Sequence, residues 1–146
     1  GKNLLPLGGR PLIAHSIEVA RKVPRVEAII VSTDSEDIAE VARRHGAETP
    51  FRRPAELATD TAPEWQAWRH AIDWFQRERG GLDVFLSLPA TSPFRSPEDV
   101  EACIDLLLED AGTDAVVTVR DEVDFRFRMR FLPPSAAVSA TPDSAA

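Results

Sequence analysis

The sequence is poor in cysteine, which limits both its disulfide chemistry and its metal chemistry. It contains a single cysteine, Cys103, so no disulfide can form within the chain. The cysteine and the three histidines show none of the spacings of a zinc site. Because this cysteine usage fits a reducing compartment, we expect a cytoplasmic protein.

Long hydrophobic runs and an excess of positive charge are also absent. The apolar stretches are far shorter than the roughly 20 residues of a membrane-spanning helix, and the N-terminus lacks the apolar core of a signal peptide. We therefore expect no membrane segment. The 17 basic and 24 acidic side chains leave a net charge of -7. This balance argues against general binding to nucleic acid or to anionic lipid, but it leaves room for a local basic pocket that binds a small anion.

Periodic hydrophobic patterns run through most of the chain. The 146 residues, 43% of them hydrophobic, suffice for one domain with a core. The patterns predict the order helix, strand, helix, short strand, helix, strand, helix, strand. Helices that connect parallel strands do so almost always with a right-handed crossover. We therefore expect an α/β fold, a doubly wound three-layer α/β/α sandwich with a mostly parallel sheet. This domain should occupy residues 1–131, and the Pro/Ala/Ser-rich residues 132–146 should form a disordered tail.

Local signals mark the ends of the elements. Pro11 suits a first helical turn, Gly46 a left-handed helix end, and Ser96 a helix N-cap followed by acidic residues. Thr61 and Glu64 have the spacing of a capping box. We predict helices over about 11–23 and 36–45, a third opening near Thr61 and a fourth at Ser96, with strands over 27–34, 49–51, 82–88 and 114–119. The strands over 27–34 and 82–88 are expected to be buried, and Trp65, Trp68 and Trp74 to serve packing.

Polar residues follow two of the predicted strands. Ser32, Thr33 and Asp34 end the first, and residues 89–95 follow the strand that ends at Leu88. In doubly wound sheets the ligand lies beyond the carboxyl ends of the strands, so function is expected here. Asp34, Asp60 and Thr61 are more simply explained as helix caps than as ligands. The histidines, His15, His45 and His70, are given no chemical role.

Several segments in order resemble the acylneuraminate cytidylyltransferases, the CMP-sialic acid synthetases. These are "KN" at the start, "RPAELATDTA" (53–62) and "LPATSPFRSPEDV" (88–100), together with "GGRPLIAHSIEVA", "IIVSTDSEDIAEVARRHGAE" and "TDAVVTV". The resemblance implies a Rossmann-like nucleotidyltransferase fold of the nucleotide-diphospho-sugar transferase type. It also implies transfer of CMP from CTP to an acidic nine-carbon sugar, release of pyrophosphate, assistance by Mg²⁺ and a homodimer.

The resemblance assigns residues only where the motifs match. The nucleotide-binding candidates are Lys2, Asn3, Arg53, Ala62, Thr91 and Ser92, and the substrate-binding candidates are Pro89, Arg95 and Arg126. No catalytic residue and no metal ligand is assigned. Two positions depart from the family: Glu64 stands where a small hydroxyl residue is common, and Pro89 stands where many members carry a glutamine. Proline has neither a side-chain amide nor a backbone N–H and cannot donate a hydrogen bond.

Two alternative functions stay open. "LGGRP" (7–11) matches the family's turn before the first helix and lacks the strand and the Lys-Ser/Thr of a phosphate loop. We therefore expect the chain to begin inside the nucleotide loop and to lack the family's C-terminal metal-binding aspartates. The chain could accordingly be a catalytically inactive nucleotide- or partner-binding fragment. A 3-deoxy-octulosonate-type sugar is another alternative, although "LPATSPFR" fits the sialic-type enzymes better than the "GDEP"-type turn of the octulosonate enzymes.

Overall fold

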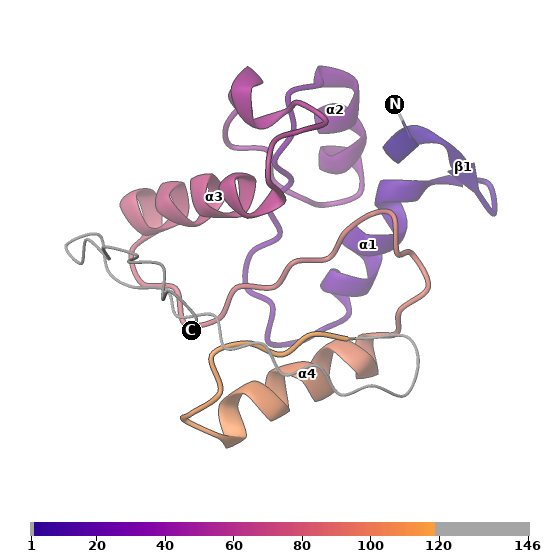
Figure 1. Cartoon of the computed structure of the whole chain (residues 1–146). Helices are drawn as coiled ribbons and strands as arrows, with labels where there is room; N and C mark the ends of the chain where they lie inside the picture. Colours follow the sequence, from indigo (N-terminus) through magenta and orange to yellow (C-terminus); the bar gives the residue numbers. More distant parts are fainter. Residues whose placement is uncertain (1, 119–146) are drawn as a thin grey trace, which may run out of the picture. The chain divides into compact units, whose positions relative to one another are not determined.

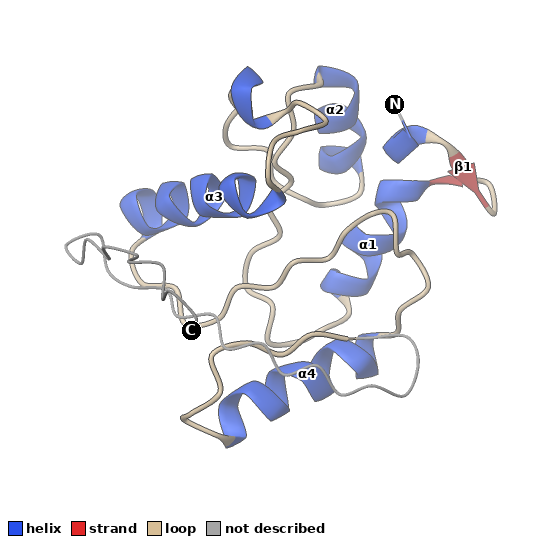
Figure 2. Cartoon of the chain, viewed as in Figure 1, coloured by secondary structure: helices blue, strands red, loops and turns tan. Residues whose placement is uncertain are grey.

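The computed structural model describes residues 2–118, and helices dominate this part of the chain (Figure 1, Figure 2). Its contacts divide the chain into two units, one ending at Val100 and one beginning at Glu101. The α-helices are α1 (Leu12–Arg21), α2 (Glu36–Arg44), α3 (Glu64–Arg79) and α4 (Pro97–Glu109). The shorter elements are the 3-10 helices η1 (Lys2–Leu4) and η2 (Ala55–Leu57) and the strands β1 (Pro6–Leu7) and β2 (Arg10–Pro11).

The two glycines near the start form a tight hairpin turn. β1 and β2 pair antiparallel, with Leu7 opposite Arg10. Gly8 and Gly9, with φ of 58° and 79°, are the two residues between them. Positive φ at both central residues is what a two-residue hairpin loop requires, and glycine adopts it without a steric penalty. The expected turn before the first helix is therefore confirmed.

The predicted helices α1 and α2 are present, and α2 ends in a complete Schellman motif. Gly46, at φ 93°, is the left-handed residue. The Gly46 N–H donates to the Arg43 carbonyl at 3.0 Å, and the Ala47 N–H donates to the Ala42 carbonyl at 3.0 Å. At the other end the N-cap is Ser35, whose hydroxyl accepts from the Ile38 N–H, so the expectation that Asp34 caps this helix is wrong.

The capping box predicted at Thr61 and Glu64 is also wrong. α3 begins at Glu64 behind the N-cap Pro63, and no side chain caps it. A cap at Thr61 would place Ala62 in the first helical turn, but the residue before a proline disfavours helical dihedrals. The helix therefore begins only after Pro63. Asp60 does not cap α3 either.

A capping box does form at the predicted start of α4. The Asp99 N–H donates to the Ser96 hydroxyl at 3.1 Å, and the Ser96 N–H donates to the Asp99 carboxylate at 3.0 Å. Hydrogen bonding to the Asp99 carboxylate, first from the Ser96 backbone N–H and then from the Ser96 side chain, lowers the pKa of Asp99. The prediction that Ser96 opens this helix is confirmed.

The core of the first unit joins α1, α2 and the extended segments. Its buried members come from α1, from α2 and from the segment just after α2, and half-buried side chains pack against them. The buried residues are Ile13, Ile17, Ala42 and Ala47, and the half-buried ones are Ile29, Val31, Ile38, Val41 and Ala90. Ala90 brings the segment that follows residues 82–88 onto this core.

Residues 27–34 form less of a strand than predicted. The Val31 N–H donates to the Glu48 carbonyl at 2.8 Å, and the Glu48 N–H donates to the Ile29 carbonyl at 2.7 Å, which makes one parallel bridge, Ile30 to Glu48. The next parallel bond would need an N–H at position 50, which is a proline. Beyond it the Thr33 carbonyl accepts from the Arg53 N–H at 2.9 Å. The pairing is therefore parallel as predicted but is interrupted at Pro50.

The other predicted strands carry no assigned ladder within residues 2–118. Residues 82–88 alternate between half-buried and exposed positions, the pattern of a strand with one covered face, so the expectation that they are buried on both faces is wrong. Residues 27–32 likewise have no fully buried member. The order of helices and extended segments is compatible with an α/β fold, while the three-layer sandwich stays a prediction. The proposed tail, 132–146, lies outside the described residues.

The tryptophans of α3 differ in their packing. Trp74 lies 5.5 Å from the ring of Phe51, and Trp68 lies 6.0 Å from the ring of Phe85, so both serve packing as predicted. Trp65 is 52% exposed, so the expectation that it also serves packing is wrong for a core position. None of the helices in residues 2–118 combines the length and the apolar character that a bilayer crossing needs.

Candidate functional site

Arg53 is bound to the end of the extended segment 27–34. Its Nε donates to the Ser32 hydroxyl at 3.0 Å, and its Nη2 donates to the Ser32 carbonyl at 2.5 Å. Together with the backbone bond from Arg53 to Thr33, these contacts fix the guanidinium beside the strand end that sequence reasoning singled out. The sequence does not predict that Arg53 binds Ser32, because the two residues are 21 positions apart.

The carbonyl oxygen of Pro89 organises the second strand-end segment, residues 89–95. Three donors reach this one oxygen: the Ser92 N–H at 3.2 Å, the Arg95 Nη2 at 3.0 Å and the Ser16 hydroxyl at 3.3 Å. The first two close the segment into a compact loop, and the third ties the loop to α1. We call residues 89–95 the strand-end loop.

The strand-end loop presents polar groups around this fixed oxygen. Thr91 and Ser92 are exposed, whereas Arg95 is half-buried. Burial lowers the pKa of Arg95, because the charged guanidinium loses solvation. Its second terminal nitrogen, Nη1, is buried and has no hydrogen-bond partner among residues 2–118. The loop therefore combines accessible hydroxyls with an unsatisfied cationic donor.

Ser16 is the site residue that the sequence analysis missed. It is only 6% exposed and lies on the apolar face of α1, between Ile13 and Ile17. A hydroxyl on such a face needs an acceptor, and the Pro89 carbonyl supplies it. The signal was a polar residue within an apolar stripe, but its partner is 73 residues away in sequence.

Lys2 and Asn3 lie in η1, which packs against α1. Lys2 is exposed and Asn3 is half-buried. Polar contacts reinforce the same region: the Leu5 carbonyl accepts from the Leu12 N–H at 2.9 Å, and the Leu7 carbonyl contacts His15 Nε2 at 2.9 Å. α1 is thus the element that both η1 and the strand-end loop contact.

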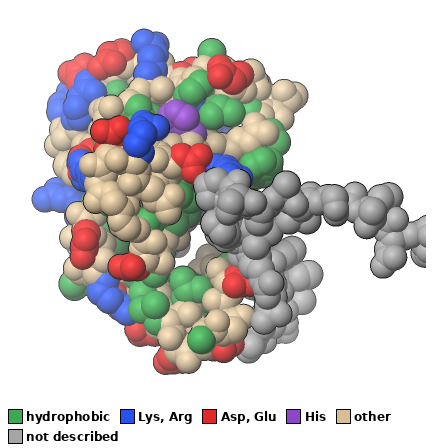
Figure 3. Space-filling view, turned by 90° about the vertical axis from the view of Figure 1, so that its left-hand side faces the viewer, with side chains coloured by type: hydrophobic (Ala, Val, Ile, Leu, Met, Phe, Trp, Pro, Cys, Tyr) green, Lys and Arg blue, Asp and Glu red, His purple; other side chains and the backbone are tan. Residues whose placement is uncertain are grey.

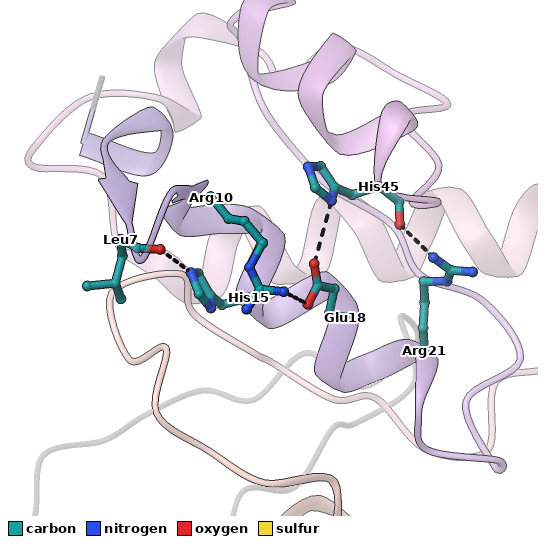
Figure 4. A network of polar contacts seen from close by, with 6 residues as sticks. All are labelled: Leu7, Arg10, His15, Glu18, Arg21 and His45. Atoms are coloured by element: carbon teal, nitrogen blue, oxygen red, sulfur yellow. Dashed lines mark hydrogen bonds and ion pairs between the residues drawn. The ribbon is translucent and has the colours of Figure 1, made fainter.

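Figure 4 shows a further polar network centred on α1, in which Glu18 lies between a basic residue of the hairpin and a histidine at the end of α2. The residues drawn are Leu7, Arg10, His15, Glu18, Arg21 and His45. Glu18 accepts from Arg10 and lies 3.8 Å from His45, and Arg21 donates to the His45 carbonyl at 3.4 Å. The network ties α1 to the hairpin and to the end of α2.

A pocket of 230 Å³ lies at the N-terminus of α2. Its lining is Thr33, Asp34, Ser35, Glu36, Ala39, Arg43, Thr49, Pro50, Phe51 and Arg52. Arg43 donates to Glu36 at 2.5 Å and to Thr49 at 2.7 Å, and the bond from Arg43 lowers the pKa of Glu36. The volume is below the roughly 300–1,000 Å³ typical of ligand pockets. Basic and acidic side chains are also intermixed on the face seen in Figure 3, as they are in this pocket.

The remaining predicted residues are not brought into one cluster by the described contacts. The Ala62 N–H donates to the Thr59 carbonyl at 3.2 Å, which places it in a turn before α3. Arg126 lies outside the described residues. Within residues 2–118 no three His, Cys, Asp or Glu side chains gather as metal ligands would.

Comparison with known proteins assigns the chain to a family. A family model described as cytidylyltransferase matches residues 1–129. A CMP-N,N'-diacetyllegionaminic acid synthase of Legionella pneumophila is 42% identical over 73% of this chain and 46% of the relative. An N-acylneuraminate cytidylyltransferase of Escherichia coli is 36% identical over 72% of this chain and 24% of the relative. A 3-deoxy-manno-octulosonate cytidylyltransferase of Anaeromyxobacter is 35% identical over 71% of this chain and 39% of the relative.

The chain thus spans about half or less of the length of these relatives. The family model nevertheless covers the hairpin, all four described α-helices and both strand-end segments. The chain belongs to the cytidylyltransferase family.

Proposed function

We propose that the protein transfers CMP from CTP to a nonulosonic acid of the sialic type and releases pyrophosphate. The observation that carries the proposal is the strand-end loop, which α1 and Arg95 close around the Pro89 carbonyl while Thr91 and Ser92 stay exposed. The relatives named for legionaminic and acylneuraminic acids support the choice of sugar. The three-layer sandwich and a homodimer belong to the same proposal.

The reaction brings two anionic substrates together, so their mutual repulsion must be offset. The anomeric oxygen of the sugar bonds to the α-phosphorus, the bond from that phosphorus to the bridging oxygen breaks, pyrophosphate leaves and the hydroxyl proton is released. Both substrates are anions, so the site needs fixed N–H donors and cations. Mg²⁺ would neutralise phosphate charge when bound. This proposal assigns no residue as a ligand of Mg²⁺.

Each candidate residue has a role suited to its surroundings. Lys2 and Asn3 would contact phosphate, and the fixed guanidinium of Arg53 would lie against the cytosine, with backbone groups near Ala62 completing base recognition. Thr91 and Ser92 would donate hydroxyls to the substrates, and Pro89, Arg95 and Arg126 would border the sugar. These residues bind and orient, and none is assigned as the base.

Two other functions are alternatives to this proposal. A 3-deoxy-octulosonate-type sugar is favoured by the Anaeromyxobacter relative. The other alternative is a nucleotide- or partner-binding module without catalysis.

One assay separates the three functions. The protein is incubated with CTP, Mg²⁺ and, in turn, N-acetylneuraminate, N,N'-diacetyllegionaminate and 3-deoxy-manno-octulosonate, and both pyrophosphate and CMP-sugar are measured. We expect product with a nine-carbon sugar. Product with the octulosonate alone supports the second function, and a folded protein that forms no product with any sugar contradicts the proposal.

A further inference from the structure

Arg53 is held at three points along the end of the extended segment 27–34. Its backbone N–H donates to the Thr33 carbonyl at 2.9 Å, its Nε donates to the Ser32 hydroxyl at 3.0 Å, and its Nη2 donates to the Ser32 carbonyl at 2.5 Å. An arginine side chain has several rotatable bonds, so a single hydrogen bond would leave the guanidinium free to turn. Nε and Nη2 form one edge of the planar group, and bonding at both fixes its plane as well as its position.

The remaining nitrogen of the guanidinium is Nη1. Within residues 2–118 it has no hydrogen-bond partner but, unlike Nη1 of Arg95, it is not buried. Arg53 therefore presents accessible N–H donors in a fixed direction. A donor that is oriented before a ligand arrives binds at a lower entropic cost than one that must first be ordered.

The main chain that holds Arg53 is itself anchored. Thr33 is only 7% exposed, and its hydroxyl accepts from the Ser35 N–H at 3.1 Å. The Ser35 hydroxyl in turn caps α2. Any residue at position 32 would offer a carbonyl to Nη2, but the acceptor for Nε comes from the Ser32 side chain. The serine hydroxyl is therefore the part of this arrangement that depends on the residue type.

The adjacent Arg52 shows what an arginine is like without these anchors. It is exposed, and no hydrogen bond holds it within residues 2–118. We propose that Ser32 is a positioning residue for nucleotide binding: its hydroxyl holds the Arg53 guanidinium so that Nη1 donates to an acceptor atom of the cytosine ring. Cytosine offers two such acceptors, O2 and N3, and arginine can only donate. This inference rests on the proposed function, in which Arg53 contacts the cytosine, and adds the residue that orients the contact.

Paired variants separate positioning from structural support. Ser32→Ala removes the acceptor of Nε and keeps the carbonyl that binds Nη2, while Ser32→Thr retains a hydroxyl and is the rescue variant. Ser35→Ala is the matched control, because it deletes a hydroxyl from the same stretch, removes the N-cap of α2 and takes away no contact of Arg53. Arg53→Met removes the donors, and Arg52→Met removes the same charge from the adjacent position.

The first readout is the binding of cytidine, which carries the base without phosphate charge and does not require turnover. Its affinity and the Arg53 side-chain N–H resonances are followed by NMR. We expect cytidine to shift the Arg53 resonances and to bind about three- to tenfold more weakly to Ser32→Ala and at least about tenfold more weakly to Arg53→Met. Ser32→Thr, Ser35→Ala and Arg52→Met should stay within about twofold of the wild type, although Ser35→Ala lowers Tm.

A double variant tests whether Ser32 acts through Arg53. If it does, Ser32→Ala should cause no further loss of cytidine affinity in the Arg53→Met background, because the contact that it orients is already gone. An equal loss in both backgrounds would show that Ser32 acts in another way and would overturn the inference. The absence of any cytidine-dependent shift at Arg53 in the wild-type chain would overturn it as well.

The second readout is the CMP-sugar assay, in which Ser32→Ala should raise the KM for CTP about three- to tenfold and leave kcat nearly unchanged. If product forms and this KM is the same in Ser32→Ala and the wild type, the proposed function holds and the inference fails. If cytidine binding depends on Ser32 through Arg53 but no sugar gives product, the inference holds for a nucleotide site and the proposed function fails. Should Ser32→Ala not fold, Ser32→Cys replaces it, since a thiol of similar size is a weak acceptor.

Discussion

Replacing Gly46 by alanine tests the end of α2, on which part of the core depends. Gly46 has φ 93°, a conformation that L-residues rarely adopt, and a Cβ there would lie 3.3 Å from the Cδ and Nε of Arg21. Arg21 is a flexible, exposed side chain and can move aside, so the backbone strain is the main cost. The left-handed conformation costs an L-residue about 1–2 kcal/mol.

The measured free energy of unfolding shows only part of that cost, because the substitution also changes the unfolded state. Alanine stiffens the unfolded chain and returns about 0.4–1 kcal/mol. Gly81→Ala is the matched control, because Gly81 has no positive φ and a Cβ added to it would meet nothing within 4 Å. Gly81→Ala is stabilised by the same loss of unfolded-state entropy but has no backbone strain. The difference in free energy of unfolding between the two variants therefore measures the strain at Gly46. We expect Gly46→Ala to be less stable than Gly81→Ala by about 1–2 kcal/mol.

The assay is urea unfolding followed by circular dichroism, with thermal melts in parallel. A difference of 1 kcal/mol corresponds to roughly 4–8 °C in Tm for a unit of this size. Gly46→Asn should fall between the other two variants, since asparagine tolerates the left-handed region better than alanine. Equal stability of Gly46→Ala and Gly81→Ala would refute the Schellman ending of α2.

Two further predictions concern the core and α4. Ile17 is only 2% exposed, so Ile17→Ala should cost about 2–5 kcal/mol in urea unfolding and Ile17→Val about 0.5–1.5 kcal/mol, because each deletes buried methyl groups. The lowered pKa of Asp99 means that its capping contribution is complete above the ordinary value of 3.8 and is lost as the pH falls through the folded-state pKa. Ser96→Ala should raise the Asp99 pKa toward that value in an NMR carboxyl titration, and an unchanged pKa would contradict the capping box.

Local signals predicted the helices well and failed where two signals competed. Gly46 and Ser96 behave as their residue types predict, since a left-handed end and an N-cap depend on neighbours within a few residues. Thr61 has the spacing of a cap, but Pro63 overrides it. Trp65 fits a helical stripe, yet it is 52% exposed, because a stripe in the sequence does not specify which of its members another segment covers.

Pairing between segments was not predictable from the same signals. The apolar run at 27–34 predicts a strand, and its partner at Glu48 is in parallel register, but the ladder stops where Pro50 lacks an N–H. The contacts of Ser16 with Pro89 and of Arg53 with Ser32 likewise join residues far apart in sequence. Such contacts depend on how segments meet in space, which composition and period do not encode.

The departure from the family at position 89 connects these observations. The resemblance expects a glutamine there, and Pro89 cannot replace its donor. What Pro89 does supply is a carbonyl oxygen that accepts from Ser16, Ser92 and Arg95. Any residue has a carbonyl, but the fixed φ of proline lowers the entropy lost when the strand-end loop closes. The loop therefore lacks a donor at its first residue and holds an unsatisfied donor, Arg95 Nη1, at its last. In the proposed enzyme, position 89 therefore contributes a hydrogen-bond acceptor to the loop and no donor.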